Sequence, residues 1–298
     1  MVHYFILNPN AGATNSCARV TEEVKKIFGD NDNYILYETK SQGDAFRHVK
    51  EVCETLEEET VFYACGGDGT VFEVVNGLAG CDKAILAVMP TGSCNDFLKT
   101  YPDKDFSKLE NLVNGTYVPV DLLKINDFYS INVGNAGFDA KVNDDVCKMV
   151  LKHKNVKKAY TRSIIKNLLH KKPYKVKVYS DGELVKDGNI LLMAFANGCY
   201  YGGGYNCAPN ALPDDGLMDI VIFDNVSIFK LAKYIGKYKK GEHVNNLKLQ
   251  KICKILKGQT VEIESENDLC FCIDGETVWD KKFTIEVLKH HIRFVLPQ

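Results

Sequence analysis

The chain has 298 residues and a formal net charge of −2 at pH 7, and this length is sufficient for two domains with separate cores. The near-neutral charge argues against a protein that binds nucleic acid through overall positive charge. No segment approaches the ~20 consecutive apolar residues of a membrane span, so we expect a cytoplasmic protein whose membrane contact is peripheral.

The eleven cysteines indicate a reducing compartment. None forms a Cys-x-x-Cys pair, and Cys53, Cys65, Cys270 and Cys272 lie in apolar runs. Cysteine there serves as a small buried hydrophobic residue, and neither a disulfide framework nor a zinc site is expected.

The first part of the chain alternates short apolar runs with segments of helical periodicity. Strands are expected at 3–7, 34–37, 61–65 and 85–89, and helices at 20–28, 45–56 and 71–77. Alternation with short loops predicts a parallel sheet covered by helices on both faces, a doubly wound α/β domain. Ligands of such sheets bind beyond the carboxyl ends of the strands, where the loops 8–12, 66–70 and 90–96 lie.

The loop Gly66-Gly67-Asp68-Gly69-Thr70 links an apolar strand to a helix. In this geometry backbone N–H groups converge on a phosphate at the positive end of a helix dipole. A carboxylate beside phosphates is repulsive, so Asp68 indicates Mg²⁺ bridging or orientation of a donor group. The alternative is an ordinary tight turn whose Asp caps the next helix.

From residue 117 on, short apolar runs are separated by turns. Asn126-Asp127, Asp181-Gly182 and Asp187-Gly188 are hairpin signals, which predict an antiparallel β-sandwich or barrel after a boundary near residue 123. The expected strands are 118–125, 128–133, 176–179, 184–185, 190–196, 218–223, 261–263, 269–273, 283–288 and 292–296.

Three further segments each allow two interpretations. The loop 212–217 carries Asp214 and Asp215 and suits a hard cation or a simple acidic turn. Asp274-Gly275-Glu276 is typical of a hairpin turn. Residues 148–177 contain many Lys and Arg but no Asp or Glu, which fits a solvated helix face or docking to an anionic membrane.

Together, these segments resemble the diacylglycerol kinase catalytic family, in its bacterial lipid-kinase branch beside the sphingosine kinases. The matching segments are 8–12, 66–70, 90–96, 135–140, 201–219 and 274–276. The Gly-Gly-Asp-Gly-Thr motif alone is shared with NAD kinases. Cys94 stands where the family commonly has glycine, and Leu98-Lys99 replaces a usual Ala-Arg.

The resemblance implies a nucleotide cleft between two domains. The first is an NAD-kinase-like α/β domain, residues 1–123 with a returning strand at 289–298, and the second is a β-sandwich domain, residues 124–288, for the lipid acceptor and a structural metal. ATP contacts are implied at Asn8, Thr39, Gly66, Gly67, Asp68, Gly69, Thr70, Val71, Phe72, Thr91 and Asn95.

The resemblance also implies metal and catalytic residues. A structural Mg²⁺ is expected on the Leu212 carbonyl, Asp215 and the Leu217 carbonyl, and an acidic network of Asp68, Asp96 and Asp121 around the active Mg²⁺. Asp274 and Glu276 match the catalytic pair. Either is a candidate general base, and Glu276 holds the position usually so labelled.

The function expected from this assembly is ATP-dependent phosphorylation of a lipid hydroxyl, with diacylglycerol, which gives phosphatidic acid, as the first candidate. The expected partner is a lipid at an anionic membrane surface, not nucleic acid, and a homodimer is possible. The alternatives are an NAD kinase, although the Asn-Glu dipeptide expected of that family is absent from the sequence, and a non-catalytic membrane-surface binding module.

Overall fold

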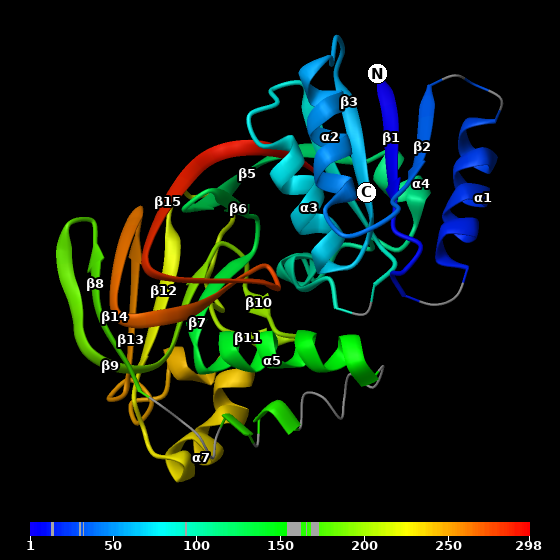
Figure 1. The fold of residues 1–298 in the computed structure, drawn as a ribbon. Coiled ribbons are helices and arrows are strands. Elements are labelled where there is room, and N and C mark those ends of the chain that lie inside the picture. The colour runs from blue at the N-terminus through cyan, green and yellow to red at the C-terminus, as the bar shows by residue number, and fades with distance from the viewer. Residues whose placement is uncertain are drawn as a thin grey trace.

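A computed structural model describes the chain except residues 13–14, 30, 32, 93, 154–161, 165 and 168–172. It has an N-terminal α/β unit and a C-terminal β-rich unit, which two long strands connect (Figure 1). This architecture confirms the predicted fold class. No described helix is both long and apolar enough to cross a membrane.

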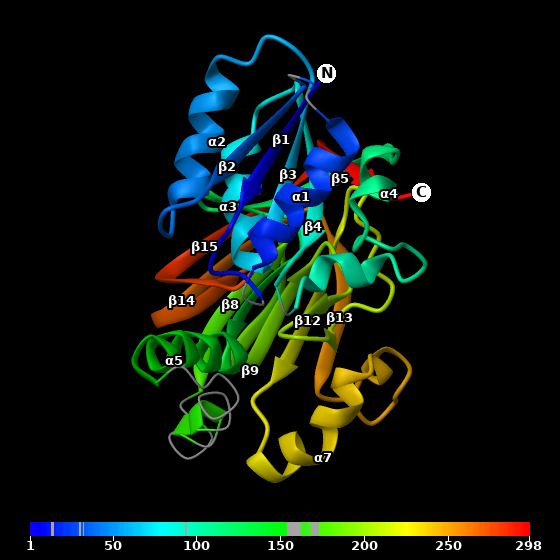
Figure 2. The same cartoon turned by 90° about the vertical axis from the view of Figure 1, so that its right-hand side faces the viewer.

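The N-terminal unit is built on four parallel strands in the order β4-β3-β1-β2. These are β1 (Val2–Leu7), β2 (Tyr34–Glu38), β3 (Thr60–Gly66) and β4 (Ala84–Pro90). Every residue of β3 is buried, as expected of a central strand covered on both faces. Helices α2 (Asp44–Glu54) and α3 (Asp68–Leu78) pack together on one face, whereas α1 (Ser16–Phe28) and α4 (Leu109–Val113) lie on the other (Figure 2).

Helix α3 begins at Asp68, three residues earlier than expected. The Gly67 carbonyl accepts hydrogen bonds from the Thr70 and Val71 N–H groups, so 68–70 form the first helical turn. Because glycine has low helix propensity, the sequence did not indicate this earlier start of the helix. A 3₁₀ turn, η1 (Asp96–Thr100), follows the loop after β4.

The β-rich unit is antiparallel throughout its described pairings. Strands β7 and β8 each lie between β9 and β14, so two layers share β9 and β14 and enclose a core that includes Phe195, Phe271 and Phe283. The strands are β5 (Thr116–Ile125), β6 (Phe128–Ser130), β7 (Val133–Gly137), β8 (Tyr174–Ser180), β9 (Glu183–Ala196), β10 (Tyr200–Tyr201), β11 (Tyr205–Asn206), β12 (Met218–Asp224), β13 (Cys253–Gly258), β14 (Thr260–Ile273) and β15 (Glu276–Leu296).

Several expected strand boundaries were wrong. The predicted turn at Asp187-Gly188 lies inside β9, where Gly188 has φ +135° and lets the strand bend. Strands β14 and β15 each join two predicted strands across a shift in pairing register, because bulges let a long strand pass between layers. The predicted strand 128–133 is instead divided between β6 and β7.

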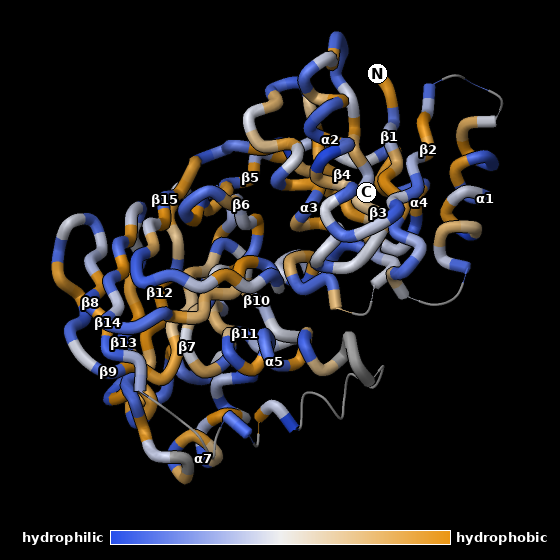
Figure 3. The backbone as a smooth tube through the Cα atoms, viewed as in Figure 1, coloured by the Kyte–Doolittle hydropathy of each residue, from blue (hydrophilic) through white to orange (hydrophobic). Residues whose placement is uncertain are grey.

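Three features were not predicted from the sequence: β13, helix α7 (Ile228–Lys239) and the start of helix α5 (Phe138–His153). Both helices carry a periodic apolar signal: Phe138, Val142 and Val146 are four residues apart, and Leu231 and Ile235 share this spacing. A short 3₁₀ turn, η2 (Glu242–Val244), follows α7. In Figure 3 hydrophobic residues concentrate along the inner strands of both units.

Strand β15 connects the two units. Its first part pairs with β14, and near its end Arg293 and Phe294 pair in parallel with β4. Strand β5 runs antiparallel to β15 over 285–296 (Figure 1). We propose that the chain forms two domains. The first consists of residues 1–123 and 289–298, and the second of residues 124–288.

Candidate active site

Three loops meet at the carboxyl edge of the N-terminal sheet. Asn8 Nδ2 donates to Thr70 Oγ1 at 2.8 Å. A Cβ on Gly12 would lie 1.7 Å from the Thr91 carbonyl oxygen, and one on Gly92 would lie 2.4 Å from Gly67 Cα. The loops 8–12, 66–70 and 90–96 are therefore in direct backbone contact.

Residues of the 90–96 loop hold the glycine-rich turn in place through hydrogen bonds. The Gly66 carbonyl accepts hydrogen bonds from the Thr91 and Gly92 N–H groups and from Asn95 Nδ2, each at 3.1 Å. Directly after it, the Asp68 and Gly69 N–H groups at the start of α3 precede the first hydrogen bonds of the helix, which Thr70 and Val71 donate to the Gly67 carbonyl. The helix dipole favours an anion there.

Two predicted ligand-binding residues carry buried atoms without a partner. Thr91 Oγ1 and Asn95 Oδ1 are buried and, within the described part of the chain, have no hydrogen-bond partner. Buried polar atoms in proteins are normally satisfied, so each is suited to a bound polar ligand. The predicted Thr39 instead donates from Oγ1 to the Leu7 carbonyl at 3.3 Å, and the predicted Phe72 packs its ring 6.2 Å from that of Phe128.

Asp68 points into the site. Its Oδ1 accepts from the Asp96 N–H at 2.8 Å and its Oδ2 from the Asn95 N–H at 3.1 Å. Burial raises the pKa of Asp68, and the nearby Asp96 carboxylate adds to the rise. Asp96 pairs with Lys99 and accepts from the Gly203 N–H at 2.6 Å, so it joins the α/β unit to the three-glycine loop of the β-rich unit.

Asp274 lies in the tight turn between β14 and β15, where it has φ +46°. Its Oδ1 accepts from Ser130 Oγ at 2.7 Å and the Val133 N–H at 2.9 Å, and its Oδ2 from the Ile131 N–H at 2.9 Å. Burial raises the pKa of Asp274 to about 6. The segment is the hairpin turn that the pattern indicated, and it also orients a carboxylate toward the site.

Glu276 reaches from the β-rich unit to the glycine-rich turn. Its Oε1 lies 3.8 Å from the position of a Cβ on Gly69, and its Oε2 accepts from Gln42 Nε2 at 3.2 Å. Burial raises the pKa of Glu276, with a contribution from Glu73. Gln42 and Glu73 were missed from sequence; Glu73 accepts from the Gly43 N–H at 2.7 Å and so fixes the turn that carries Gln42.

A cavity of about 580 Å³ opens beside Asp68, Asp96 and Asp274. Its wall is mainly apolar and comes in part from α5, α7 and β9, with Phe138, Val142, Leu192, Leu231 and Ile235 among its residues. The residues that line this cavity were not predicted, because they come from elements far apart in sequence.

One carboxyl group lies in the apolar wall. Asp139 Oδ2 accepts from the Tyr201 hydroxyl at 2.6 Å, and the Tyr201 and Tyr238 hydroxyl oxygens are 3.2 Å apart. Burial raises the pKa of Asp139 to about 6. Asp139 is thus a polar group in this wall, where Asn132, Asn135 and Asn143 also line the cavity.

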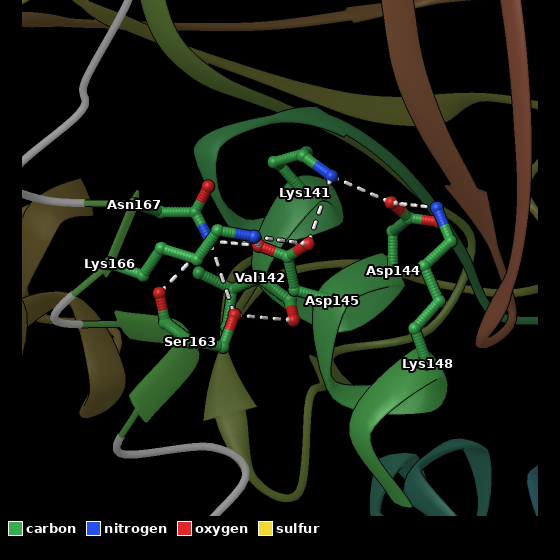
Figure 4. Close-up of polar contacts among 8 residues, drawn as sticks. All are labelled: Lys141, Val142, Asp144, Asp145, Lys148, Ser163, Lys166 and Asn167. Carbon is green, nitrogen blue, oxygen red and sulfur yellow. Dashed lines mark hydrogen bonds and ion pairs between the residues drawn. The ribbon is translucent and has the colours of Figure 1, made fainter. Parts of the chain in front are cut away.

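Asp145 ties Lys166 and Asn167 to α5, whereas Asp144 pairs with lysines of α5 itself (Figure 4). Asp144 binds Lys148 Nζ at 2.8 Å, and Asp145 binds Lys166 Nζ at 3.1 Å and Asn167 Nδ2 at 2.8 Å. These contacts place Ile164 at the cavity wall. The basic stretch thus has acidic partners directly before it in sequence; much of it, including Lys154, Lys157, Lys158, Lys171 and Lys172, lies outside the described residues.

The predicted metal-binding carboxylates differ in their surroundings. Asp68 and Asp96 are neighbouring carboxylates whose repulsion a cation would relieve, so they suit Mg²⁺. Asp215 is engaged elsewhere: its Oδ2 lies 2.7 Å from Lys257 Nζ. The buried Asp121 accepts from the Gly216 and His290 N–H groups, each at 2.7 Å.

Within the described residues, no group of three or more His, Cys, Asp or Glu side chains is arranged to hold a metal. The structural Mg²⁺ at Leu212, Asp215 and Leu217, and the place of Asp121 in an active-site network, remain predictions.

The α/β unit and the β-sandwich unit, with the cleft between them, form a two-domain fold. An NAD kinase from Archaeoglobus fulgidus shares this fold, with a TM-score of 0.54 at 12% identity over 100% of this chain and 94% of that one. In sequence, the Diacylglycerol kinase catalytic domain matches residues 3–125, and the YegS C-terminal NAD kinase beta sandwich-like domain matches residues 132–296. The chain belongs to the family of YegS-like and diacylglycerol kinases.

Individual relatives agree with this assignment. A "Probable lipid kinase YegS-like" of Shewanella frigidimarina is 34% identical over 78% of this chain and 75% of its own length. The diacylglycerol kinase of Bacillus subtilis is 29% identical over 98% and 95%. The crystal structure of a diacylglycerol kinase from Bacillus anthracis has a TM-score of 0.74 at 25% identity and covers 99% of this chain and 96% of that one.

Proposed function

We propose that the protein transfers the γ-phosphoryl group of ATP to the hydroxyl group of a lipid, with diacylglycerol as the first candidate and phosphatidic acid as its product. The cavity of about 580 Å³ carries the proposal, because it opens beside Asp68 and Asp274 in the cleft that holds the glycine-rich turn. An acyl chain fits a mainly apolar wall, whereas NAD, a charged dinucleotide, does not.

ATP is proposed to bind along Gly66, Gly67, Asp68, Gly69 and Thr70, with further contacts at Asn8, Thr39, Val71, Phe72, Thr91 and Asn95. The unpartnered oxygen atoms of Thr91 and Asn95 support this placement. The backbone N–H groups at the start of α3 would receive the phosphates.

Glu276 and Asp274 are proposed to have different roles. Three hydrogen bonds to the Asp274 carboxylate hold residues 130–133, so Asp274 is a positioning residue. Glu276 has a single described hydrogen bond and lies beside Gly69. Asp274 lines the cavity and Glu276 does not. We propose Glu276 as the acceptor of the hydroxyl proton because it is held by fewer hydrogen bonds and lies beside the glycine-rich turn.

Asp68 and Asp96 are the residues proposed to hold Mg²⁺. When bound, the ion would neutralise charge on the transferring phosphoryl group. Lys99, which pairs with Asp96, holds that carboxylate at the junction of the two units. Peripheral association with an anionic membrane and homodimerisation are also proposed, and neither is needed for the chemistry.

The test is transfer of radiolabel from ATP to a panel of acceptors in mixed micelles: diacylglycerol, monoacylglycerol, a sphingoid base, phosphatidylglycerol and a polyprenol, with NAD included. We expect a labelled lipid with wild type and with Glu286→Gln, an exposed control on the same strand as Glu276, but a loss of at least about 10²-fold with Asp68→Asn and Glu276→Gln. Equal transfer by all four proteins would overturn the site assignment, and NADP as the labelled product would overturn the lipid assignment.

A further inference from the structure

Helix α7 has a cationic outer face, and the sequence analysis did not single it out. Residues 228–240 contain five lysines and no Asp or Glu. In the same segment the side chain of Phe229 is 84% exposed, which is unusual for a large aromatic residue. The helix lies at the end of the β-rich unit distant from the N-terminal sheet (Figures 1 and 2). The exposed lysines are Lys230, Lys233, Lys237, Lys239 and Lys240.

The inner face of the same helix forms part of the cavity wall. Leu231, Ile235 and Tyr238 line the cavity, at the i, i+4 and i+7 spacing of one helix face. A single helix therefore separates the apolar cavity from a cationic surface. Whatever binds this surface lies one helix diameter, about 10 Å, from the cavity.

The lysines of α7 are less neutralised than Lys148 and Lys166, two described lysines of the stretch 148–177. Lys148 and Lys166 bind the buried Asp144 and Asp145. On α7, only Lys237 comes within 4.0 Å of a carboxylate in the described part of the chain, that of Glu242. Lys233 and Lys239 instead lie 5.6 Å and 5.2 Å from the ring centroids of Tyr234 and Tyr205.

We propose that the outer face of α7 docks the protein on an anionic phospholipid bilayer. Lysines near such a surface attract its negative headgroups, and an exposed aromatic side chain inserts between them. Docking in this orientation places the cavity wall against the membrane, so that an acceptor lipid enters along α7. The entry route rests on the proposed lipid kinase activity, whereas the docking surface does not.

The first experiment measures flotation with phosphatidylcholine vesicles, with and without phosphatidylglycerol, in the absence of ATP and acceptor lipid. We expect wild type to bind only the anionic vesicles, with an affinity that falls as salt rises. At about 1 kcal/mol, or fivefold, per lysine, Lys230→Glu/Lys233→Glu is expected to bind about 30-fold more weakly or worse. Phe229→Ser is also expected to weaken binding.

The matched control is Lys25→Glu/Lys26→Glu, which makes the same change of charge on the exposed face of α1. We expect it to float like wild type. Equal losses of vesicle binding in both double variants would overturn the proposal, and so would unchanged vesicle binding by the α7 variant. A wild-type protein that does not bind anionic vesicles and binds another partner instead would also overturn it. Circular dichroism melting verifies that each variant is folded.

The second experiment separates docking from catalysis. With a water-soluble short-chain acceptor, the α7 variants are expected to keep the wild-type rate, and with a long-chain acceptor in anionic vesicles they are expected to lose it. If wild type phosphorylates no lipid, the proposed function fails, whereas the flotation result still decides the docking surface. Loss of the rate on both acceptors would overturn the assigned route.

Discussion

Gly12→Ala tests whether the contact between two loops shapes the nucleotide site. Gly12 has φ +73°, and a Cβ there would lie 1.7 Å from the Thr91 carbonyl oxygen. Carbon and oxygen atoms in contact are normally more than about 3 Å apart, so Thr91 must move by more than an ångström or the 8–12 loop must withdraw. Either change displaces the loop that carries the Thr91 hydroxyl and holds the Gly66 carbonyl.

The matched control is Gly80→Ala. Gly80 has φ +86° but no atom within 4 Å of its Cβ position. Both variants carry the cost of a left-handed backbone for a residue with a side chain, about 1–2 kcal/mol in the free energy of unfolding. Only Gly12→Ala adds a steric clash, so the difference between the two variants isolates the loop contact from backbone strain.

The assay combines chemical denaturation with kinase kinetics. We expect Gly80→Ala to lower stability with unchanged kcat and KM for ATP. Gly12→Ala should lower stability further and raise KM for ATP by about tenfold or more, the equivalent of one lost hydrogen bond of about 1.4 kcal/mol. A Gly12→Ala variant with the KM of Gly80→Ala would refute the role of the 90–96 loop in nucleotide binding.

Two further predictions concern carboxylates. Glu276→Gln should lower kcat with little change in the free energy of unfolding. Asp274→Asn should lower the free energy of unfolding, because the hydrogen bonds from residues 130–133 to this side chain weaken. If Asp274→Asn instead lowers only kcat, Asp274 is the base. Asp139 has a pKa raised to about 6 by burial, so its protonated form is favoured in the fold and its contribution is lost as pH rises from about 4 through 6. The free energy of unfolding, measured against pH, should fall more steeply for wild type than for Asp139→Asn over that window. Parallel curves for the two proteins would contradict the raised pKa of Asp139.

The glycine-rich turn 66–70 could be predicted from sequence because its signal is local. A buried strand, three glycines within four residues and a helix follow one another over a short stretch, and the same local logic identified the loops 8–12 and 90–96. Glu276 and Asp274 became candidates only through a family resemblance. Their pattern alone favoured a hairpin turn, which is what the backbone forms.

Features set by distant residues could not be predicted in this way. The cavity combines side chains from α5, α7 and β9, and no window of sequence contains them. The stretch 148–177 looked like a bare cationic segment because Asp144 and Asp145 lie just outside it. Turns were expected at the polar residues 265–268 and at Gly188. In the structure these positions lie inside β14 and β9, because pairing with neighbouring strands continues both strands.

The position of Asp121 shows how the two halves of the site are held in register. Strand β15 leaves the site at Glu276 and joins the N-terminal sheet at Arg293, and its pairing with β5 shifts between Leu288 and Ile292. His290, at that shift, has φ +53°, and its N–H donates to Asp121 on β5. Because the other oxygen of Asp121 holds Gly216, one buried carboxylate fixes both the bend of β15 and the 213–216 loop. The placement of Glu276 relative to the glycine-rich turn 66–70 thus depends on a strand that Asp121 braces at its bend.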